Sequence, residues 1–244
     1  MFSFKQFTIE QDRCAMKVGT DGVLLGAWTP LFHKPFNILD IGAGTGLIAL
    51  MLAQRSDAQQ IDAVEIDEEA YEQCVENFEQ SKWNDRLFCY HASIDEFTEE
   101  LFEDEEEYDL IVSNPPFYSE NYSSGNDKRD QARFQEALPF DDLIESAQAL
   151  LSENGIFAVI IPYKEEGNFI ESAQSVGLFP LKITRVKGNE TSEIKRSLLA
   201  FSRIEQEPLV DELTIETDRH KYTAEYTELT KHFYLKMQKE QIKE

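Results

Sequence analysis

Residues 108–117 read Tyr108-Asp109-Leu110-Ile111-Val112-Ser113-Asn114-Pro115-Pro116-Phe117, an apolar run typical of a buried strand that ends in an amide, two prolines and an aromatic ring. The residue before a proline is disfavoured in the helical region, and each proline has a fixed φ and no N–H group. The end of this run is therefore expected to be stiff and extended, with carbonyl groups free to face a ligand. An amide oxygen from Asn114, a carbonyl from Pro115 and the flat ring of Phe117 together suit a nucleobase with an exocyclic amine.

A glycine-rich loop precedes this run in the chain. The strand pattern of residues 36–41 leads into Gly42-Ala43-Gly44-Thr45-Gly46, and an apolar helix is expected over residues 47–53. Glycines allow the backbone to approach a ligand closely and to present it to a helix N-terminus. A dinucleotide-binding loop has the spacing Gly-x-Gly-x-x-Gly, but here the third glycine comes one position early. Gly-x-Gly-x-Gly after an acidic residue, Asp40, instead resembles the loop that binds S-adenosylmethionine.

The next strand pattern, residues 60–67, contains acidic residues at its end. A carboxylate at this position can accept hydrogen bonds from both hydroxyls of a ribose, so Glu65 is the expected ribose ligand. Asp67 is expected to cap the helix that follows, residues 68–80.

Strand and helix patterns alternate through most of the chain, which predicts an α/β fold. Two late strands, residues 179–186 and 197–202, are joined by a loop and are expected to pair antiparallel. We therefore expect a Rossmann-like sheet of about seven strands, parallel for the first five and with a reversed edge strand, as in S-adenosylmethionine methyltransferases.

The chain is expected to form a single domain over residues 1–244, with a catalytic core at 35–204 and an extension at each end. The N-terminal extension, residues 1–34, is predicted to hold a short strand and a helix with Thr20 or Asp21 as N-cap. That helix start is interpreted either as purely structural or as facing the cofactor. The C-terminal extension, residues 205–244, is predicted to hold a short strand, a turn and a helix over residues 223–237.

The formal charge of −24 argues against a non-specific nucleic-acid binder, and much of the excess lies in residues 95–107. A local basic patch is still compatible with this charge. The long segment 118–138 carries Lys128, Arg129 and Arg133, which we interpret as RNA-binding residues beside the base pocket; a loop of mixed charge with no role is the alternative. A second basic cluster contains Lys182, Arg185, Lys187, Lys195 and Arg196.

Composition indicates a cytoplasmic protein. No apolar run approaches the roughly 20 residues that cross a bilayer, so no membrane association is expected. The start of the chain alternates aromatic and polar residues and does not read as a signal peptide. Cys14, Cys74 and Cys89 are far apart in sequence and lack the spacing of a metal site, so we expect buried, reduced thiols and no bound metal. No protein partner is evident from the sequence.

The motif at residues 114–117 matches the Asn-Pro-Pro-Tyr/Phe signature of S-adenosylmethionine-dependent amino methyltransferases. The order of glycine loop, Glu65 and Asn-Pro-Pro-Phe in one fold is far more specific than any one of these motifs alone. Over nearly its whole length the chain resembles the tRNA adenine-N6 methyltransferases that modify the adenosine 3′ to the anticodon of a valine tRNA. The stretches that carry this resemblance are residues 4–7, 12–28, 130–133 and 222–234.

The resemblance implies S-adenosylmethionine as cofactor, tRNA as partner, and a specific set of site residues. The catalytic residues would be Asn114, Pro115, Pro116 and Phe117. Relatives often have an acidic residue at the place of Ser93, so here a hydroxyl or the Ile94 backbone would contact the adenine of the cofactor. The implied cofactor-binding residues are Thr20, Asp40, Gly42, Gly44, Gly46, Glu65, Ser93, Ile94 and Asn114.

Two other methyltransferase classes are alternatives. Phe117 replaces the tyrosine usual in the tRNA group, and phenylalanine also occurs in rRNA guanine-N2 methyltransferases. Protein glutamine-N5 methyltransferases use a similar Asn-Pro-Pro motif on a planar amide. A cofactor-binding module without catalysis is disfavoured, because both the cofactor motif and the acceptor motif are present.

Overall fold

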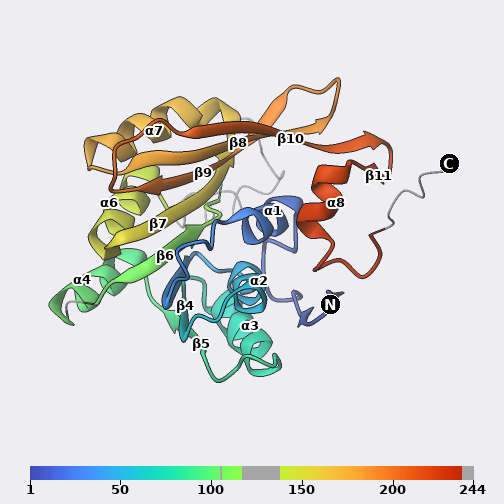
Figure 1. Cartoon of the computed structure of the whole chain (residues 1–244). Helices are drawn as coiled ribbons and strands as arrows, with labels where there is room; N and C mark the ends of the chain where they lie inside the picture. Colours follow the sequence, from blue (N-terminus) through green and yellow to red (C-terminus); the bar gives the residue numbers. More distant parts are fainter. Residues whose placement is uncertain (105, 117–137, 238–244) are drawn as a thin grey trace, which may run out of the picture.

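One large sheet organises the molecule (Figure 1). The computed structural model describes residues 1–104, 106–116 and 138–237. Within these residues nine strands form a sheet in the order β11-β10-β8-β9-β7-β6-β3-β4-β5. The strands are β3 (Asn37–Ile41), β4 (Gln60–Glu65), β5 (Leu87–His91), β6 (Tyr108–Ser113), β7 (Leu151–Pro162), β8 (Phe179–Asn189), β9 (Ile194–Ser202), β10 (Leu209–Asp218) and β11 (Lys221–Tyr222).

The predicted α/β fold is confirmed. Strands β5, β4, β3, β6 and β7 are all parallel, and β9 runs antiparallel to both β7 and β8 in the other half of the sheet. The sheet extends further than expected, because β10 pairs parallel with β8 and β11 pairs antiparallel with β10. The C-terminal extension therefore covers the edge that β8 would otherwise leave open.

Helices cover both faces of the sheet, and each face has its own hydrophobic core (Figure 1). The central strands are buried on both sides, which explains why they read as continuous apolar runs. One face is covered by α1 (Thr20–Trp28), α2 (Leu47–Arg55), α3 (Glu68–Glu79) and α8 (Ala224–Thr230); the other by α4 (Ile94–Asp104), α6 (Phe140–Leu150) and α7 (Glu166–Ser175), which follows the short 3-10 helix η1 (Tyr163–Glu165).

The two ends of the chain meet beside the sheet. Strands β1 (Phe2–Ser3) and β2 (Thr8–Ile9) form a separate hairpin. Phe4 forms an isolated bridge with Tyr234, and the Lys5 N–H donates to the Phe233 carbonyl at 2.8 Å. The helix predicted over residues 223–237 is accordingly wrong in length: Thr223 caps it and it ends at Thr230, where the chain turns to reach the N-terminal hairpin.

The predicted N-cap of α1 is also wrong. Gly19 occupies that position and no side chain caps the helix. The Asp21 carboxylate instead accepts a hydrogen bond from Arg196 Nε at 2.8 Å. Of the cysteines, Cys14 and Cys74 are buried free thiols, whereas Cys89 is partly exposed. In the described parts of the chain, no helix combines the length and hydrophobicity needed to cross a bilayer.

Candidate functional site

Three strand ends bring the main predicted residues together. Strands β4 and β6 flank β3 and run parallel to it, so their carboxyl ends lie at one edge of the sheet. The glycine loop follows β3, Glu65 ends β4, and Asn114 follows β6. The Ser113 hydroxyl donates to the Ile41 carbonyl at 2.9 Å, which ties the end of β6 to the start of the glycine loop. We call this edge, with its three strand ends, the site edge.

The glycine loop has a backbone that other residues rarely adopt. Gly42, Gly44 and Gly46 have φ angles of 70°, 55° and 75°. A Cβ at Gly42 or Gly44 would meet no atom within 4 Å, but one at Gly46 would lie 2.5 Å from a Phe78 ring carbon. The loop is thus packed against α3 at Gly46 and open at its first two glycines. An open backbone at a helix N-terminus fits a cofactor with a polar chain.

Glu65 is held in a fixed orientation beside this loop. One carboxylate oxygen accepts the Gly44 N–H at 2.7 Å and the other accepts the Asp67 N–H at 3.0 Å. The side chain is only 9% exposed, and burial raises its pKa despite these two bonds. Each carboxylate oxygen has a further lone pair, so both can still accept a hydroxyl of a ribose. Asp67 caps α3 as predicted, accepting the Ala70 N–H at 2.8 Å.

Asp40 lies fully buried near the end of β3. One of its carboxylate oxygens accepts the Ala49 N–H, in the first turn of α2, at 3.1 Å. The other has no hydrogen-bond partner among the described residues. Burial raises the Asp40 pKa to about 7, and the nearby Glu65 carboxylate adds to the shift. An unpartnered acceptor next to the glycine loop fits a ligand that supplies a donor, as the ammonium group of the methionine end would.

Helix α1 approaches the site because two glycines let it lie close to α2. A Cβ at Gly26 would lie 2.7 Å from the Met51 sulfur, and one at Gly22 would lie 3.1 Å from Leu47 Cδ2. The same Gly22 position is 4.0 Å from the Asn114 amide nitrogen. The first turn of α1, which contains the exposed Thr20, therefore borders the site edge.

Ser93 is part of a capping box at the start of α4. Its hydroxyl donates to a Glu96 carboxylate oxygen at 3.0 Å, and its N–H donates to the same oxygen at 3.1 Å. In return the Glu96 N–H donates to the Ser93 hydroxyl at 3.2 Å. Of the two expected ways to contact the adenine, this arrangement favours the Ile94 backbone over the Ser93 hydroxyl. The residues before α4 adjoin the end of β4, since the Ala92 N–H donates to the Glu65 carbonyl at 3.3 Å.

Two features beside Glu65 were not predicted. Cys14, buried as expected, lies near Glu65: burial together with the Glu65 and Asp67 charges raises its thiol pKa to about 12. The segment before α1 therefore lies close to the Glu65 corner, which only the folded chain reveals. Ile66 is 51% exposed beside Glu65. In the sequence, an apolar residue directly after Glu65 could have indicated an exposed apolar surface that contacts a flat ring such as adenine.

Several predicted residues lie outside the described part of the chain, namely Phe117, Lys128, Arg129 and Arg133. Of the two prolines in the motif, Pro115 is buried and Pro116 partly buried. The second basic cluster proves to be largely neutralised by ion pairs. Their lengths are 3.7 Å for Lys182–Asp211, 2.7 Å for Arg185–Glu166, 2.6 Å for Lys187–Glu212 and 2.8 Å for Arg196–Asp21.

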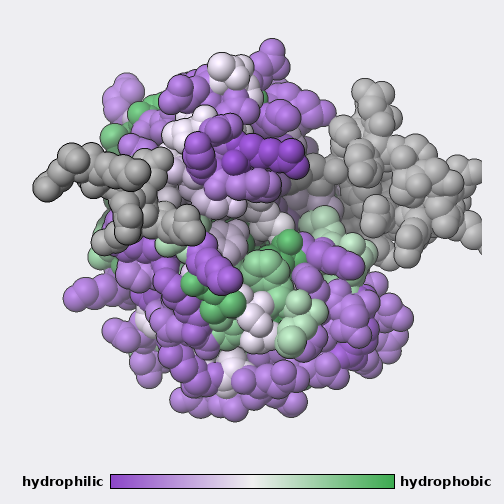
Figure 2. All heavy atoms as spheres, turned by 90° about the vertical axis from the view of Figure 1, so that its right-hand side faces the viewer, coloured by the Kyte–Doolittle hydropathy of each residue, from purple (hydrophilic) through white to green (hydrophobic). Residues whose placement is uncertain are grey.

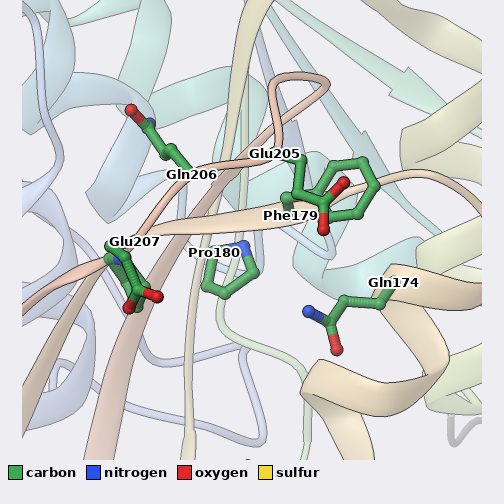
Figure 3. A pocket seen from close by; sticks show the side chains of 7 residues that line it. Gln174, Phe179, Pro180, Glu205, Gln206 and Glu207 are labelled. Carbon is green, nitrogen blue, oxygen red and sulfur yellow. The ribbon is translucent and has the colours of Figure 1, made fainter.

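A surface hollow of about 380 Å³ lies away from this site, at the amino end of β8 (Figure 3). It contains none of the predicted site residues. The amino ends of the parallel strands are at the edge opposite the glycine loop, so this hollow is separate from the site edge. Its lining residues are Gln174, Phe179, Pro180, Glu205, Gln206, Glu207 and Pro208.

Comparisons with known proteins agree with this geometry. The sequence model of the methyltransferase small domain family matches residues 24–170. The tRNA1(Val) (adenine(37)-N6)-methyltransferase of Flavobacterium johnsoniae is 67% identical over 238 residues, covering 97% of this chain and 100% of that protein. The protein of the same name from Flavobacterium psychrophilum is 68% identical over 237 residues, with 97% and 100% covered. A crystal structure of an Agrobacterium tumefaciens protein described as a predicted O-methyltransferase shares the fold, with a TM-score of 0.67 and 19% identity over 87% of this chain and 96% of that one.

Proposed function

Since this chain belongs to the family of the tRNA1(Val) (adenine(37)-N6)-methyltransferases, we propose that it methylates the N6 amine of an adenosine in tRNA, at position 37 of a valine tRNA. S-adenosylmethionine is the cofactor. The observation that carries the proposal is the placement of Asn114 and Pro115 on the same edge of the sheet as the glycine loop and Glu65. A cofactor motif and an amine-binding motif are thereby adjacent.

The residues of the site edge fit the cofactor. Glu65 would accept the ribose hydroxyls, and the loop of Gly42, Gly44 and Gly46 would lie along the methionine end. The unpartnered Asp40 oxygen would accept from a donor there. The Ser93–Ile94 corner would border the adenine, and Thr20 would close the site from α1.

The acceptor amine would be oriented by Asn114 and Pro115. When bound, S-adenosylmethionine supplies a methyl group on a positively charged sulfur. The Asn114 amide oxygen and the Pro115 carbonyl would accept hydrogen bonds from the two N–H groups of the amine, leaving its lone pair directed at that methyl group. As the amine gains the methyl group and the methyl–sulfur bond breaks, one of the two N–H protons would be released to solvent. Pro116 keeps this backbone rigid, and Phe117 would stack on a base flipped out of the RNA. Positioning of the two reactants would account for the faster methyl transfer, without a strong general base.

The tRNA substrate would place this reaction in the cytoplasm, which agrees with the free cysteines of the described chain. Binding of a tRNA also requires contacts to phosphate groups, on a protein whose formal charge is −24. We propose that Lys128, Arg129 and Arg133 supply part of them, because they follow the Asn-Pro-Pro motif closely in sequence.

The proposal is tested by incubating the protein with labelled S-adenosylmethionine and an unmodified valine tRNA transcript, followed by mass spectrometry of the nucleosides. We expect N6-methyladenosine at position 37 and no product on a transcript with guanosine there. Label in guanosine of ribosomal RNA, or in a glutamine of a protein, would contradict the proposal and favour one of the two alternative classes.

A further inference from the structure

The turn between β10 and β11 projects from the same edge of the sheet as the catalytic motif. Strand β10 is parallel to β8, which runs in the same direction as β7 because both are antiparallel to β9. The carboxyl end of β10, Asp218, therefore lies on the site edge. Arg219 and His220 form the turn, and β11 returns with Lys221 and Tyr222. We call these four residues the basic turn.

The basic turn lies too far from Asn114 to contact the same nucleotide. In the sheet order β10 is four strands from β6, which corresponds to about 19 Å. Traced through the residue pairs of neighbouring strands, Asp218 also lies about eight residues further along the strand direction than Ser113, which is roughly 26 Å. A small substrate would not span this separation, whereas a folded RNA would.

The residues of the basic turn are exposed and suited to RNA. Among the described residues no carboxylate forms an ion pair with Arg219, while Lys221 Nζ lies 3.4 Å from Asp218 in a highly exposed pair. Such exposed pairs contribute little and leave the cation available. Tyr222 is 37% exposed, with its ring 5.2 Å from that of Tyr226. By contrast, the basic residues Lys182, Arg185 and Lys187 on neighbouring β8 are held by carboxylates.

The backbone fixes the shape of the turn. His220 has a φ of 63°. A positive φ is the ordinary requirement of a two-residue hairpin turn, and histidine adopts it more readily than most residues. The run of guanidinium, imidazole, ammonium and phenol places two cations and two flat rings on a single protruding turn.

The chain is least acidic near its two ends. Residues 1–34 hold four lysines and arginines against three acidic residues, and residues 217–244 hold six against five. The acidic excess therefore lies entirely between them, including Glu190 and Glu193 in the turn of the adjacent hairpin. The described parts of these two segments meet beside the sheet, where Phe4 forms a bridge with Tyr234. Figure 2 looks onto this side, where hydrophilic residues, acidic and basic alike in its colouring, gather on the upper part.

We propose that the basic turn, Arg219 to Tyr222, binds the sugar–phosphate backbone of the tRNA away from the modified nucleotide. This inference rests on the proposed tRNA substrate. Contacts to phosphate fix the position of an RNA without reading its sequence. The turn would therefore hold the tRNA in register while Asn114 engages the flipped base.

The test compares two variants that each lose two positive charges. In the test variant, Arg219→Gln with Lys221→Gln, we expect weaker tRNA binding and a slope of log affinity against log salt that is flatter by about 1.4–1.8 for two lost phosphate contacts. The KM for tRNA should rise while kcat and cofactor affinity stay unchanged. The control variant, Lys34→Gln with Lys82→Gln, alters exposed lysines near the amino ends of β3 and β5, on the opposite edge, and should keep the wild-type slope.

Two outcomes would overturn the inference, and they differ in what else they affect. If the test variant and the control lose affinity equally, or neither changes, the basic turn contacts no RNA although the proposed function stands. If the wild-type protein neither binds nor methylates tRNA, the proposed function fails and this surface fails with it. A charge-reversed variant, Arg219→Glu with Lys221→Glu, should enlarge the loss, and its thermal unfolding confirms that the fold is kept.

Discussion

Asn114 and Glu65 lie on either side of the glycine loop and should have separable tasks. We predict that Asn114→Ala abolishes methyl transfer while the affinity for S-adenosylmethionine stays within a few fold of wild type. The reason is that Asn114 would orient the acceptor amine, with the cofactor held mainly from β3 and β4. Calorimetry for binding and single-turnover assays for transfer measure the two effects. Equal loss of both would refute this division of roles.

Glu65→Gln should have the opposite effect. The amide keeps the shape of the side chain but removes the charge that two backbone N–H groups and the ribose hydroxyls would share. Hydrogen bonds to a charged group contribute roughly 1.5–3 kcal/mol, so the Kd for the cofactor should rise roughly 10- to 150-fold. An unchanged Kd in calorimetry would remove Glu65 from the cofactor site.

Asp40 should make stability depend on pH. Its pKa in the folded protein is raised from 3.8 to about 7, so the folded state holds the proton more tightly than the unfolded state. This contribution is fully present below about pH 3.8 and is lost as the pH rises through 7; its full size is on the order of 4 kcal/mol. Asp40→Asn cannot ionise, so its advantage over wild type should grow from pH 5.5 to 8 in urea denaturation. Parallel stability curves for the two proteins would contradict the prediction.

The contact between α1 and α2 depends on the absence of a side chain at Gly26. In Gly26→Ala the new methyl group would lie 2.7 Å from Met51 Sδ and 3.0 Å from Met51 Cβ. Overpacking of this kind costs about 1–3 kcal/mol, and displacing α1 should also lower activity because Gly22 lies beside Asn114. Gly167→Ala in the first turn of α7 is the control: its methyl group would meet nothing within 4 Å, so the free energy of unfolding should stay the same or rise by less than about 1 kcal/mol. Chemical denaturation of both variants measures the difference.

The capping box of α4 allows the two possible roles of Ser93 to be separated. Ser93→Ala removes the cap and should cost about 1 kcal/mol of stability, with little change in cofactor affinity if the Ile94 backbone makes the adenine contact. Ser93→Asp keeps a cap and adds an acceptor for the adenine amine, so it should bind the cofactor more tightly than Ser93→Ala. A large loss of affinity in Ser93→Ala, without loss of stability, would assign the hydroxyl to the cofactor instead.

Because its formal charge is −24, an RNA-modifying enzyme of this kind must confine its phosphate contacts to small regions of its surface. We predict that changing Lys128, Arg129 and Arg133 together to glutamine flattens the salt dependence of tRNA binding by about 0.7–0.9 per lost contact, with cofactor affinity preserved. A salt titration of tRNA binding measures the slope. If the slope equals that of wild type, these three residues touch no phosphate. The basic turn then becomes the main candidate for the electrostatic contribution to tRNA binding.

Much of the fold and part of the site could be predicted from short stretches of sequence. The glycine loop, the rigid Asn-Pro-Pro end of β6 and the Asp67 cap are set by steric and hydrogen-bonding preferences that act within a few residues. Strand and helix periodicity was sufficient to predict the alternating α/β order. The position of Glu65 at the end of β4 followed from that order, because parallel strands bring their carboxyl ends to one edge.

The remaining features depend on partners that lie far away in the chain. Thr20 and Asp21 were the expected caps, but the helix already includes both, with Gly19 as N-cap, and the Asp21 carboxylate pairs with Arg196, 175 residues later. Lys182 and Lys187 of β8 form part of a basic cluster in the sequence, but in the fold β10 brings Asp211 and Glu212 beside them. The helix after Thr223 was predicted too long because the bridge between Phe4 and Tyr234 was not visible in the sequence. Local preferences fix the backbone of each element, whereas the partner that a charged or exposed side chain finds depends on which distant segments the sheet brings together.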